Sequence, residues 1–197
     1  MSENFYTYTF NPGVKKAQEH FGSRQIYARV EEKAPDQNEL HIREEQFIGE
    51  RDSFYISTVG ENGWPYVQFR GGPKGFLKVI DEKTLAYADF KGNLQYISTG
   101  NMNASSKAAI ILLDYPSRTR MKILVETEIK DAFEDPELLE KLKHPDYDAE
   151  IERLVIFHVK AFDWNCPQHI TPKFRLDEIT HLIKTNPEFK KLILEES

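Results

Sequence analysis

Two β-type runs, FYISTV at 54–59 and WPYVQFR at 64–70, flank the turn GENG at 60–63 and decide the fold of this chain. Aromatic and β-branched residues fill both runs and glycines bound the turn, which is the pattern of a β-hairpin. A second pair of runs, at 75–80 and 84–88, flanks the polar turn DEK at 81–83. Two hairpins in succession predict an antiparallel meander.

Further strands are expected downstream, at 108–113, 118–129 and 154–162. The run at 118–129 alternates: Met121, Ile123 and Val125 point one way, whereas Arg120 and Lys122 point the other. A short helix is expected between them and the hairpins, with Asn93 as N-cap and Gly100 as its stop. Six or so short strands with one inserted helix favour a mainly-β fold, a Greek-key or meander barrel with short flanking helices.

Helical patterns lie at both ends of the chain. We expect residues 1–50 to form an N-terminal helical appendage packed on the barrel and residues 51–174 to form the barrel domain itself. Residues 175–197 form a helical tail, which Asn186-Pro187 interrupts. A further helix is expected to start at Asp135-Pro136, with the aspartate as N-cap.

Composition narrows the function classes. The 197 residues carry 26 Lys plus Arg against 32 Asp plus Glu, a net charge of −6, which argues against binding of nucleic acid or anionic lipid. No apolar run reaches the ~18 residues that cross a bilayer, and no secretory signal is visible at the N-terminus, so we expect a cytoplasmic protein without membrane contact. The single cysteine, Cys166, excludes an internal disulfide, and the histidines show no metal-ligand spacing, so no metal site is expected.

Four clusters could carry chemistry. Glycines at 71, 72 and 75 permit close approach of a ligand, and Arg70 and Lys74 supply cations that suit a phosphate, although a solvated β-turn with incidental charges is the favoured explanation of such a run in isolation. At 88–96 a strand ends and a helix begins, so Lys91 and free N–H groups near Asn93 suit a phosphate, whereas ordinary capping is the alternative.

The third cluster is the pair Arg120 and Lys122, two cations on one strand face, which could simply face solvent. The fourth runs from Trp164 to His169. Cys166 and His169 could form a nucleophile–base pair or half a metal site, but a packed Trp164 with satisfied polar neighbours is the alternative.

These clusters follow one another in an order that resembles the pyridoxamine 5'-phosphate oxidase-like FMN-binding split barrels. The bacterial branch carries a Pro-Tyr-Val-Gln-x-Arg-Gly-Gly-Pro-x-Gly-Phe-Leu run, found here at 65–77. The similarity covers most of the chain up to about residue 174, and its other segments are 22–24, 88–97, 113–116, 120–123 and 165–170.

The resemblance implies an FMN site at the interface of a homodimer. It places Gln68, Phe69 and Arg70 along the flavin, Lys91 and Asn93 near its phosphate, and Arg120 and Lys122 opposite, on the adjacent strand. Trp164 and the residues after it, including Gln168, would come from the second subunit. An apolar, partly aromatic slot with cations and N–H donors at one end is what FMN requires.

Two departures from the family pattern bear on the activity. Phe69 and Leu94 stand where branch members often carry His and Arg, and CPQH at 166–169 replaces the Arg-x-His element of the true oxidase. Pyridoxamine phosphate oxidation is therefore not expected. The sequence favours an FMN-dependent oxidoreductase with an unnamed small-molecule substrate, in which Lys122 or Arg120 stabilises charge on the ring. A non-catalytic FMN-binding module, or one that binds heme or F420, stays open.

Overall fold

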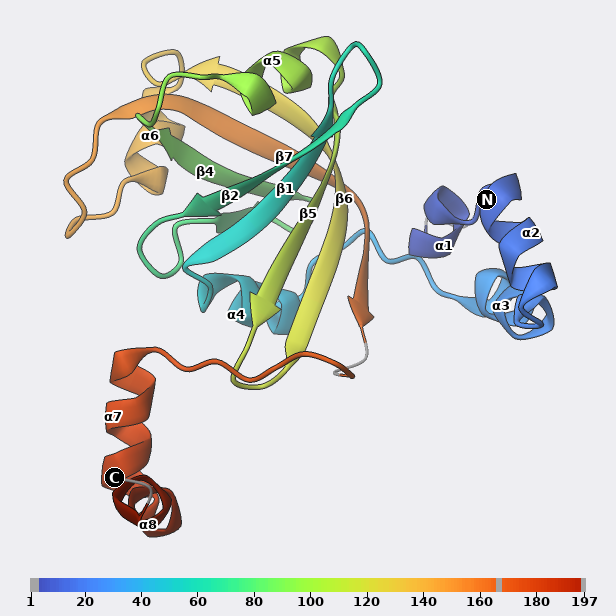
Figure 1. Cartoon of the computed structure of the whole chain (residues 1–197). Helices are drawn as coiled ribbons and strands as arrows, with labels where there is room; N and C mark the ends of the chain where they lie inside the picture. The colour runs from blue at the N-terminus through green and yellow to red at the C-terminus, as the bar shows by residue number, and fades with distance from the viewer. Residues whose placement is uncertain (1–3, 166–167, 196–197) are drawn as a thin grey trace.

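A computed structural model describes residues 4–165 and 168–195 and shows a single antiparallel sheet of seven strands (Figure 1). The strand order is β2-β1-β5-β6-β7-β4-β3, and every neighbouring pair is antiparallel. The sheet curls into a barrel, so the mainly-β split-barrel fold is confirmed. The strands are β1 Ser53–Val59, β2 Pro65–Gly71, β3 Lys78–Asp81, β4 Thr84–Phe90, β5 Lys107–Asp114, β6 Thr119–Asp131 and β7 Ile151–Asn165.

The alternation in the sequence determines which side chains fill the barrel. Met121, Ile123 and Val125 of β6 are at most 2% exposed, as the pattern at 118–129 predicts. Aromatic rings complete the core: Phe54 of β1 contacts Tyr87 of β4 and Phe157 of β7 at centroid distances of 5.4 and 6.1 Å. This core closes the barrel although β2 and β3, the two edge strands, do not pair with each other.

Three short helices lie against the barrel. They are α4 Ile42–Gly49, α5 Ile97–Ala104 and α6 Pro136–Leu142. Asp135 caps α6 by accepting a hydrogen bond from the backbone N–H of Leu138, as expected. Helix α5, however, starts at Ile97 after the left-handed residue Tyr96, so the prediction that Asn93 is its N-cap is wrong. The Asn93 side chain instead accepts from the N–H of Gln95 in a local turn.

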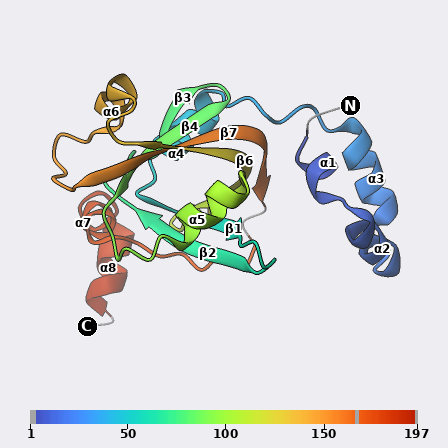
Figure 2. The ribbon, with the colours of Figure 1, turned by 90° about the horizontal axis from the view of Figure 1, so that it is seen from above.

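The helices of the two chain ends extend away from the barrel (Figures 1 and 2). The N-terminal arm contains α1 Phe5–Thr9, α2 Pro12–His20 and α3 Arg24–Lys33, and Phe5 is its only described residue among the buried apolar side chains. The C-terminal arm contains α7 Leu176–Thr185 and α8 Pro187–Glu195, separated at Asn186 as the sequence predicts. Of the helices described, none has the length and apolarity to cross a membrane.

Candidate functional site

The edge strand β2 borders the open side of the barrel. Its side chains alternate, so Gln68 and Arg70 point toward the inside while Val67 and Phe69 are 62% and 55% exposed. Opposite Arg70 lies β4, yet the two strands share no ladder. We call this unpaired opening between β2 and β4 the split.

A buried ion-pair network bridges the split. Asp89 of β4 is 3% exposed. One of its carboxylate oxygens forms an ion pair with Nη1 of Arg70 at 3.3 Å. Its other oxygen accepts hydrogen bonds from Nε and Nη2 of Arg153, on β7, at 3.1 and 2.9 Å. Arg153 also pairs with Glu152 at 2.8 Å. Two guanidinium groups are therefore fixed by one buried carboxylate.

The polar end of the split is a pocket of about 250 Å³ beside the start of α5. Ser98, which is 1% exposed, accepts from Arg70 Nη2 and donates to Gln68 Oε1, both at 2.7 Å. The loop above it is strained, because Leu94 and Tyr96 adopt φ values of 62° and 51°. We call this cavity the polar pocket; its charged lining is Arg70, Asp89, Glu152 and Arg153, two cations and two carboxylates.

The other end of the split is an aromatic slot of about 370 Å³, lined by Phe69, Phe76, Tyr87 and Phe90 together with Arg70 and Asp89. The glycine run beside it serves these rings: a Cβ on Gly71 would meet the Phe69 ring at 2.8 Å, and one on Gly72 would meet Phe76 at 2.7 Å. The glycines thus make room for aromatic side chains, which differs from the close ligand approach that the sequence suggested.

Tyr87 and Arg70 are in contact at the wall of the slot. Burial raises the pKa of Tyr87 and the charge of Asp89 raises it further, whereas the charge of Arg70 and a side-chain hydrogen bond between Arg70 and the phenol oppose this shift; the net effect keeps the phenol protonated. Neither the Tyr87 hydroxyl nor Nε of Arg70 has a further hydrogen-bond partner in the described part of the chain.

The polar pocket and the slot form one elongated site, because Arg70, Asp89 and Phe90 line both. Its shape suits a ligand with a polar end and a flat aromatic end. Its charges are balanced, so a phosphate would have to share the two arginines with Asp89 and Glu152. FMN fits the aromatic end, and it fits the polar end if its phosphate shares the arginines in this way.

The structure brings together four of the residues expected to bind the cofactor: Gln68, Arg70 and Asn93 line the polar pocket, and Phe69 lines the slot. Lys91 lines neither of them. That side chain is exposed and pairs with Glu150 at 2.8 Å, which raises the pKa of Lys91. A contact between Lys91 and a phosphate stays a prediction. For this contact to form, the lysine would have to break its ion pair with Glu150.

Arg120 and Lys122 lie elsewhere. They belong to β6, which β1 and β5 separate from β2, so β6 is not the strand adjacent to β2. Their contact with a flavin stays a prediction. Three strand spacings of about 4.8 Å lie between β2 and β6. Lys122 pairs with Asp163 at 3.6 Å and stands 4.7 Å over the Phe5 ring of α1. The Nε of Arg120 is buried without a partner among the described residues.

Trp164 packs within its own subunit. Its indole N–H donates to Glu44 Oε1 at 2.9 Å, and its ring contacts Phe47 at 4.7 Å and the guanidinium of Arg43 at 4.3 Å. Gln168, on the surface after β7, is exposed. The pair proposed from Cys166 cannot be placed, since that cysteine lies outside the described residues.

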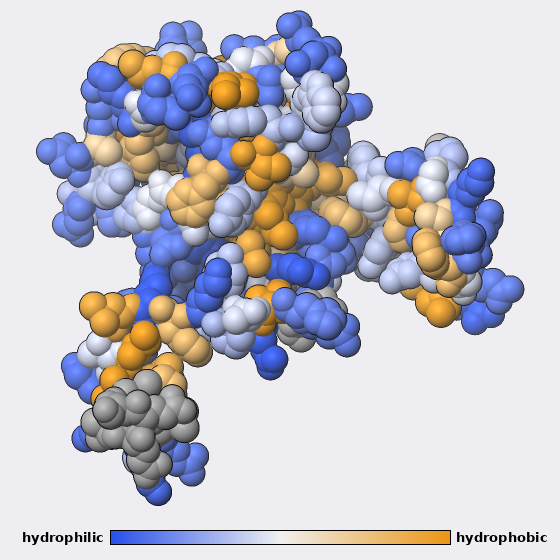
Figure 3. Space-filling view, viewed as in Figure 1, coloured by the Kyte–Doolittle hydropathy of each residue, from blue (hydrophilic) through white to orange (hydrophobic). Residues whose placement is uncertain are grey.

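The outer face of the sheet is unusually apolar. Tyr55, Val59, Val67 and Phe69 on β1 and β2 are 37%, 46%, 62% and 55% exposed. Figure 3 shows apolar side chains gathered over the middle of this face, where β1 and β5 run in Figure 1. Patches of this kind mark interaction surfaces.

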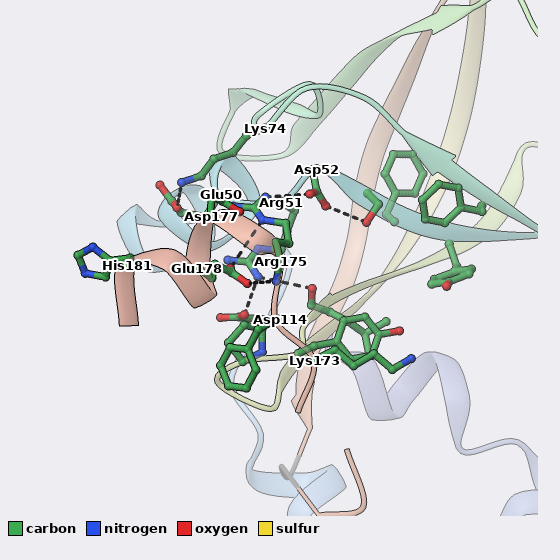
Figure 4. A pocket seen from close by; sticks show the side chains of 18 of the residues that line it. Glu50, Arg51, Asp52, Lys74, Asp114, Lys173, Arg175, Asp177, Glu178 and His181 are labelled. Carbon is green, nitrogen blue, oxygen red and sulfur yellow. Dashed lines mark hydrogen bonds and ion pairs between the residues drawn. The ribbon is translucent and has the colours of Figure 1, made fainter. Parts of the chain in front are cut away.

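A second cavity, of about 720 Å³, lies between the barrel end and α7. We call it the C-terminal cleft. In Figure 4 its carboxylates and cations point toward one another. The guanidinium of Arg175 forms three ion pairs, with Asp52 at 2.9 Å, Asp177 at 3.2 Å and Glu178 at 3.8 Å. Five carboxylates and four cations line the cleft, His181 aside, which suits a phosphate less than the split does.

Sequence reasoning missed four residues of the split: Tyr87, Asp89, Ser98 and Arg153. Asp89 and Ser98 lie in or beside a cluster noted at 88–96, and a buried acid directly after the apolar run at 85–88 could have been suspected. Nothing near Arg153 in the chain points to Asp89, which lies 64 positions away. No group of three or more potential metal ligands occurs in the described ranges.

Comparison with known proteins bears on this geometry. A family model described as pyridoxamine 5'-phosphate oxidase matches residues 40–165, which contain the whole barrel. Among curated proteins, none matches the sequence significantly.

Two solved structures show the same fold. HupZ of Group A Streptococcus is 16% identical with a TM-score of 0.51, and the match covers 68% of this chain and 100% of HupZ. A Lactobacillus delbrueckii protein assigned to pyridoxamine 5'-phosphate oxidase is 19% identical with a TM-score of 0.51, over 65% of this chain and 96% of that one. At such identities the likeness concerns the fold alone.

Proposed function

Because the chain belongs to the pyridoxamine 5'-phosphate oxidase family, we propose that it binds FMN in the split and acts as an FMN-dependent oxidoreductase. The observation that carries this proposal is the continuity of the aromatic slot with the polar pocket. The flavin ring would lie among Phe69, Phe76 and Phe90, and the phosphate end would reach the start of α5. Bound FMN would supply hydride transfer between two small molecules.

The chain's own residues have distinct tasks in this proposal. Asp89 holds Arg70 and Arg153 in place before the cofactor arrives, so less side-chain freedom is lost on binding. Gln68 is held by Ser98 and offers its amide to the ligand. The free edge of β2 leaves backbone N–H and C=O groups available along the slot. These polar groups would orient the ring and the ribityl chain.

We also propose a homodimer, in which a second copy covers the apolar outer face of the sheet. Twofold symmetry gives each chain the same patch and the same partner residues. Arg120 and Lys122 are too far from β2 to share a flavin ring within one subunit, so in this arrangement they serve the partner's site.

The absorbance spectrum of the purified protein tests the cofactor. We expect flavin bands and release of FMN, but not FAD, on denaturation. Heme or deazaflavin bands, or a colourless protein that takes up no added FMN, would refute the proposal. The mass in solution tests the dimer: light scattering should give twice the 23.0 kDa of the chain, and tight FMN binding by a monomer would contradict a shared site.

Turnover separates an enzyme from a module that only captures flavin. Oxidation of reduced nicotinamide should be followed with several acceptors, in the presence and absence of saturating FMN. Steady-state turnover that depends on FMN supports the oxidoreductase. If the protein binds FMN but no electron donor reduces it, the oxidoreductase activity is refuted and only the flavin-binding function is supported.

A further inference from the structure

The C-terminal cleft has the size of a small-molecule site and is rich in aromatic rings. Its volume of about 720 Å³ lies within the roughly 300 to 1,000 Å³ that such sites occupy. Tyr55 and Phe69 form part of its wall, with their ring centroids 5.5 Å apart. A flat molecule can therefore pack against this wall. The rings that line the cleft are Phe54, Tyr55, Phe69, Tyr115 and Phe174.

The ion pairs of the cleft leave an acidic surplus on its α7 side. Asp114 pairs with Arg51 at 3.0 Å, and Glu50 pairs with Lys74, so each of these two carboxylates has a cation of its own. By contrast, the single guanidinium of Arg175 serves three carboxylates. This surplus repels an anionic ligand and attracts a cation. The three carboxylates are those of Asp52, Asp177 and Glu178.

A cation of the chain itself already lies over one ring of the cleft. Nζ of Lys173 is 4.8 Å from the centroid of the Tyr115 ring, which is within the range of about 6 Å for a cation–π contact. In the described part of the chain, Lys173 takes part in no ion pair. Figure 4 shows Asp177 and Glu178 together on α7, apart from Lys173. The face of the Tyr115 ring thus holds an ammonium group that a ligand cation can replace.

We propose that the C-terminal cleft binds a planar organic cation. The carboxylates around Arg175 attract its charge, and its ring packs on Tyr115 in place of Lys173. Phe69 lines both the cleft and the aromatic slot, so this cation would lie beside the flavin. Only that last point rests on the proposed function, in which the cation would be the class of small molecule that reacts with the cofactor.

The test uses three probes that share one ring system and differ in charge: N-methylquinolinium is a cation, quinoline is neutral at slightly alkaline pH, and quinoline carboxylate is an anion. Each is titrated calorimetrically into the full-length protein, with and without saturating FMN. We expect the cation to bind at least about tenfold more tightly than the other two probes. FMN should not displace it, because the flavin is proposed to lie in the split.

Three variants locate the bound probe. Tyr115→Leu should weaken binding of the cation roughly threefold to tenfold, and Asp177→Asn roughly twofold to fivefold. Lys173→Ala should instead strengthen it roughly twofold to fivefold, because the change frees the ring face and removes a like charge. Lys184→Ala is the matched control: it removes the same charge from α7 at a position that does not line the cleft, so the affinity should hardly change.

Opposite effects of Tyr115→Leu and Lys173→Ala support the site. The proposal is overturned if the three probes bind alike, if none binds, or if Lys173→Ala binds the cation no more tightly than Lys184→Ala does. Lys173 is exposed, so this last comparison holds even if Tyr115→Leu does not fold. Displacement of the cation by FMN also overturns the proposal. A wild type that binds the cation but takes up no FMN would refute the proposed function alone.

Discussion

The split and the C-terminal cleft contain ion pairs of the same length in different surroundings. Arg153–Asp89 and Arg175–Asp52 both measure 2.9 Å, but the side chains of the first pair are 15% and 4% exposed and those of the second 43% and 42%. The distance alone therefore does not show which of the two ion pairs contributes more to the stability of the fold. Water competes with and screens the exposed pair, whereas the buried carboxylate has no substitute partner.

The first and largest expected effect is on folding. Asp89→Ala leaves Arg70 and Arg153 buried without their shared carboxylate, so we expect it to lower the free energy of unfolding by about 3 to 5 kcal/mol. Asp52→Ala should cost no more than about 1 kcal/mol, because solvent screens that pair. Urea unfolding of both variants measures this. Equal losses would show that burial does not separate the two regions.

The second prediction concerns ligand binding. Arg70→Ala removes a guanidinium that faces both the polar pocket and the slot, and we expect FMN affinity to fall roughly tenfold to a hundredfold. Arg175→Ala, in the C-terminal cleft, should change it less than about twofold. Fluorescence titration with FMN gives both values, and circular dichroism checks that each variant is folded. A larger loss of FMN affinity in Arg175→Ala than in Arg70→Ala would indicate that the flavin binds in the C-terminal cleft and not in the split.

The third prediction decides how the phosphate is held. Lys91 would have to leave Glu150 to reach the ligand, so we expect Lys91→Ala to weaken FMN binding by at most about tenfold. Riboflavin affinity should hardly change, since riboflavin lacks the phosphate. Lys74→Ala, which breaks the similarly exposed pair with Glu50, is the matched control. Equal losses for FMN and riboflavin would show that Lys91 does not contact the phosphate.

The smallest expected effect is the pH dependence of the C-terminal cleft. Burial raises the pKa of Asp52, but hydrogen bonds from Arg175 and Ser53 outweigh it and hold this pKa below its ordinary value. A depressed pKa means that the pair stabilises the fold above the unfolded pKa of about 3.9 and loses this contribution as the pH falls further.

Asp52→Asn should therefore lose less stability than the wild type between about pH 5 and pH 3. Because the pair is well exposed, the difference should stay below about 0.5 kcal/mol. Melting curves across this range measure it. Parallel curves for the two proteins would mean that Arg175 does not hold Asp52 in solution.

The local sequence determined the strands and most helices. Period-two alternation assigns inner and outer faces in β2 and β6, and the Asp135 cap and the Asn186-Pro187 break locate helix ends; each signal spans only a few residues. In β2, where the sequence predicted Gln68, Phe69 and Arg70 all along the flavin, the alternation puts Gln68 and Arg70 on one side and Phe69 on the other. The order of motifs along the chain also indicated the family.

Only the tertiary structure decided which strands meet. The order β2-β1-β5-β6-β7-β4-β3 sets Arg70 across from Asp89 and brings Arg153 to the same carboxylate, while it removes Arg120 and Lys122 from β2. Helix α5 starts only at Ile97, because Leu94 and Tyr96 before it adopt left-handed conformations that no local propensity favours. Ion pairs and slot walls join residues far apart in the chain, and their partners depend on the packing of the whole barrel.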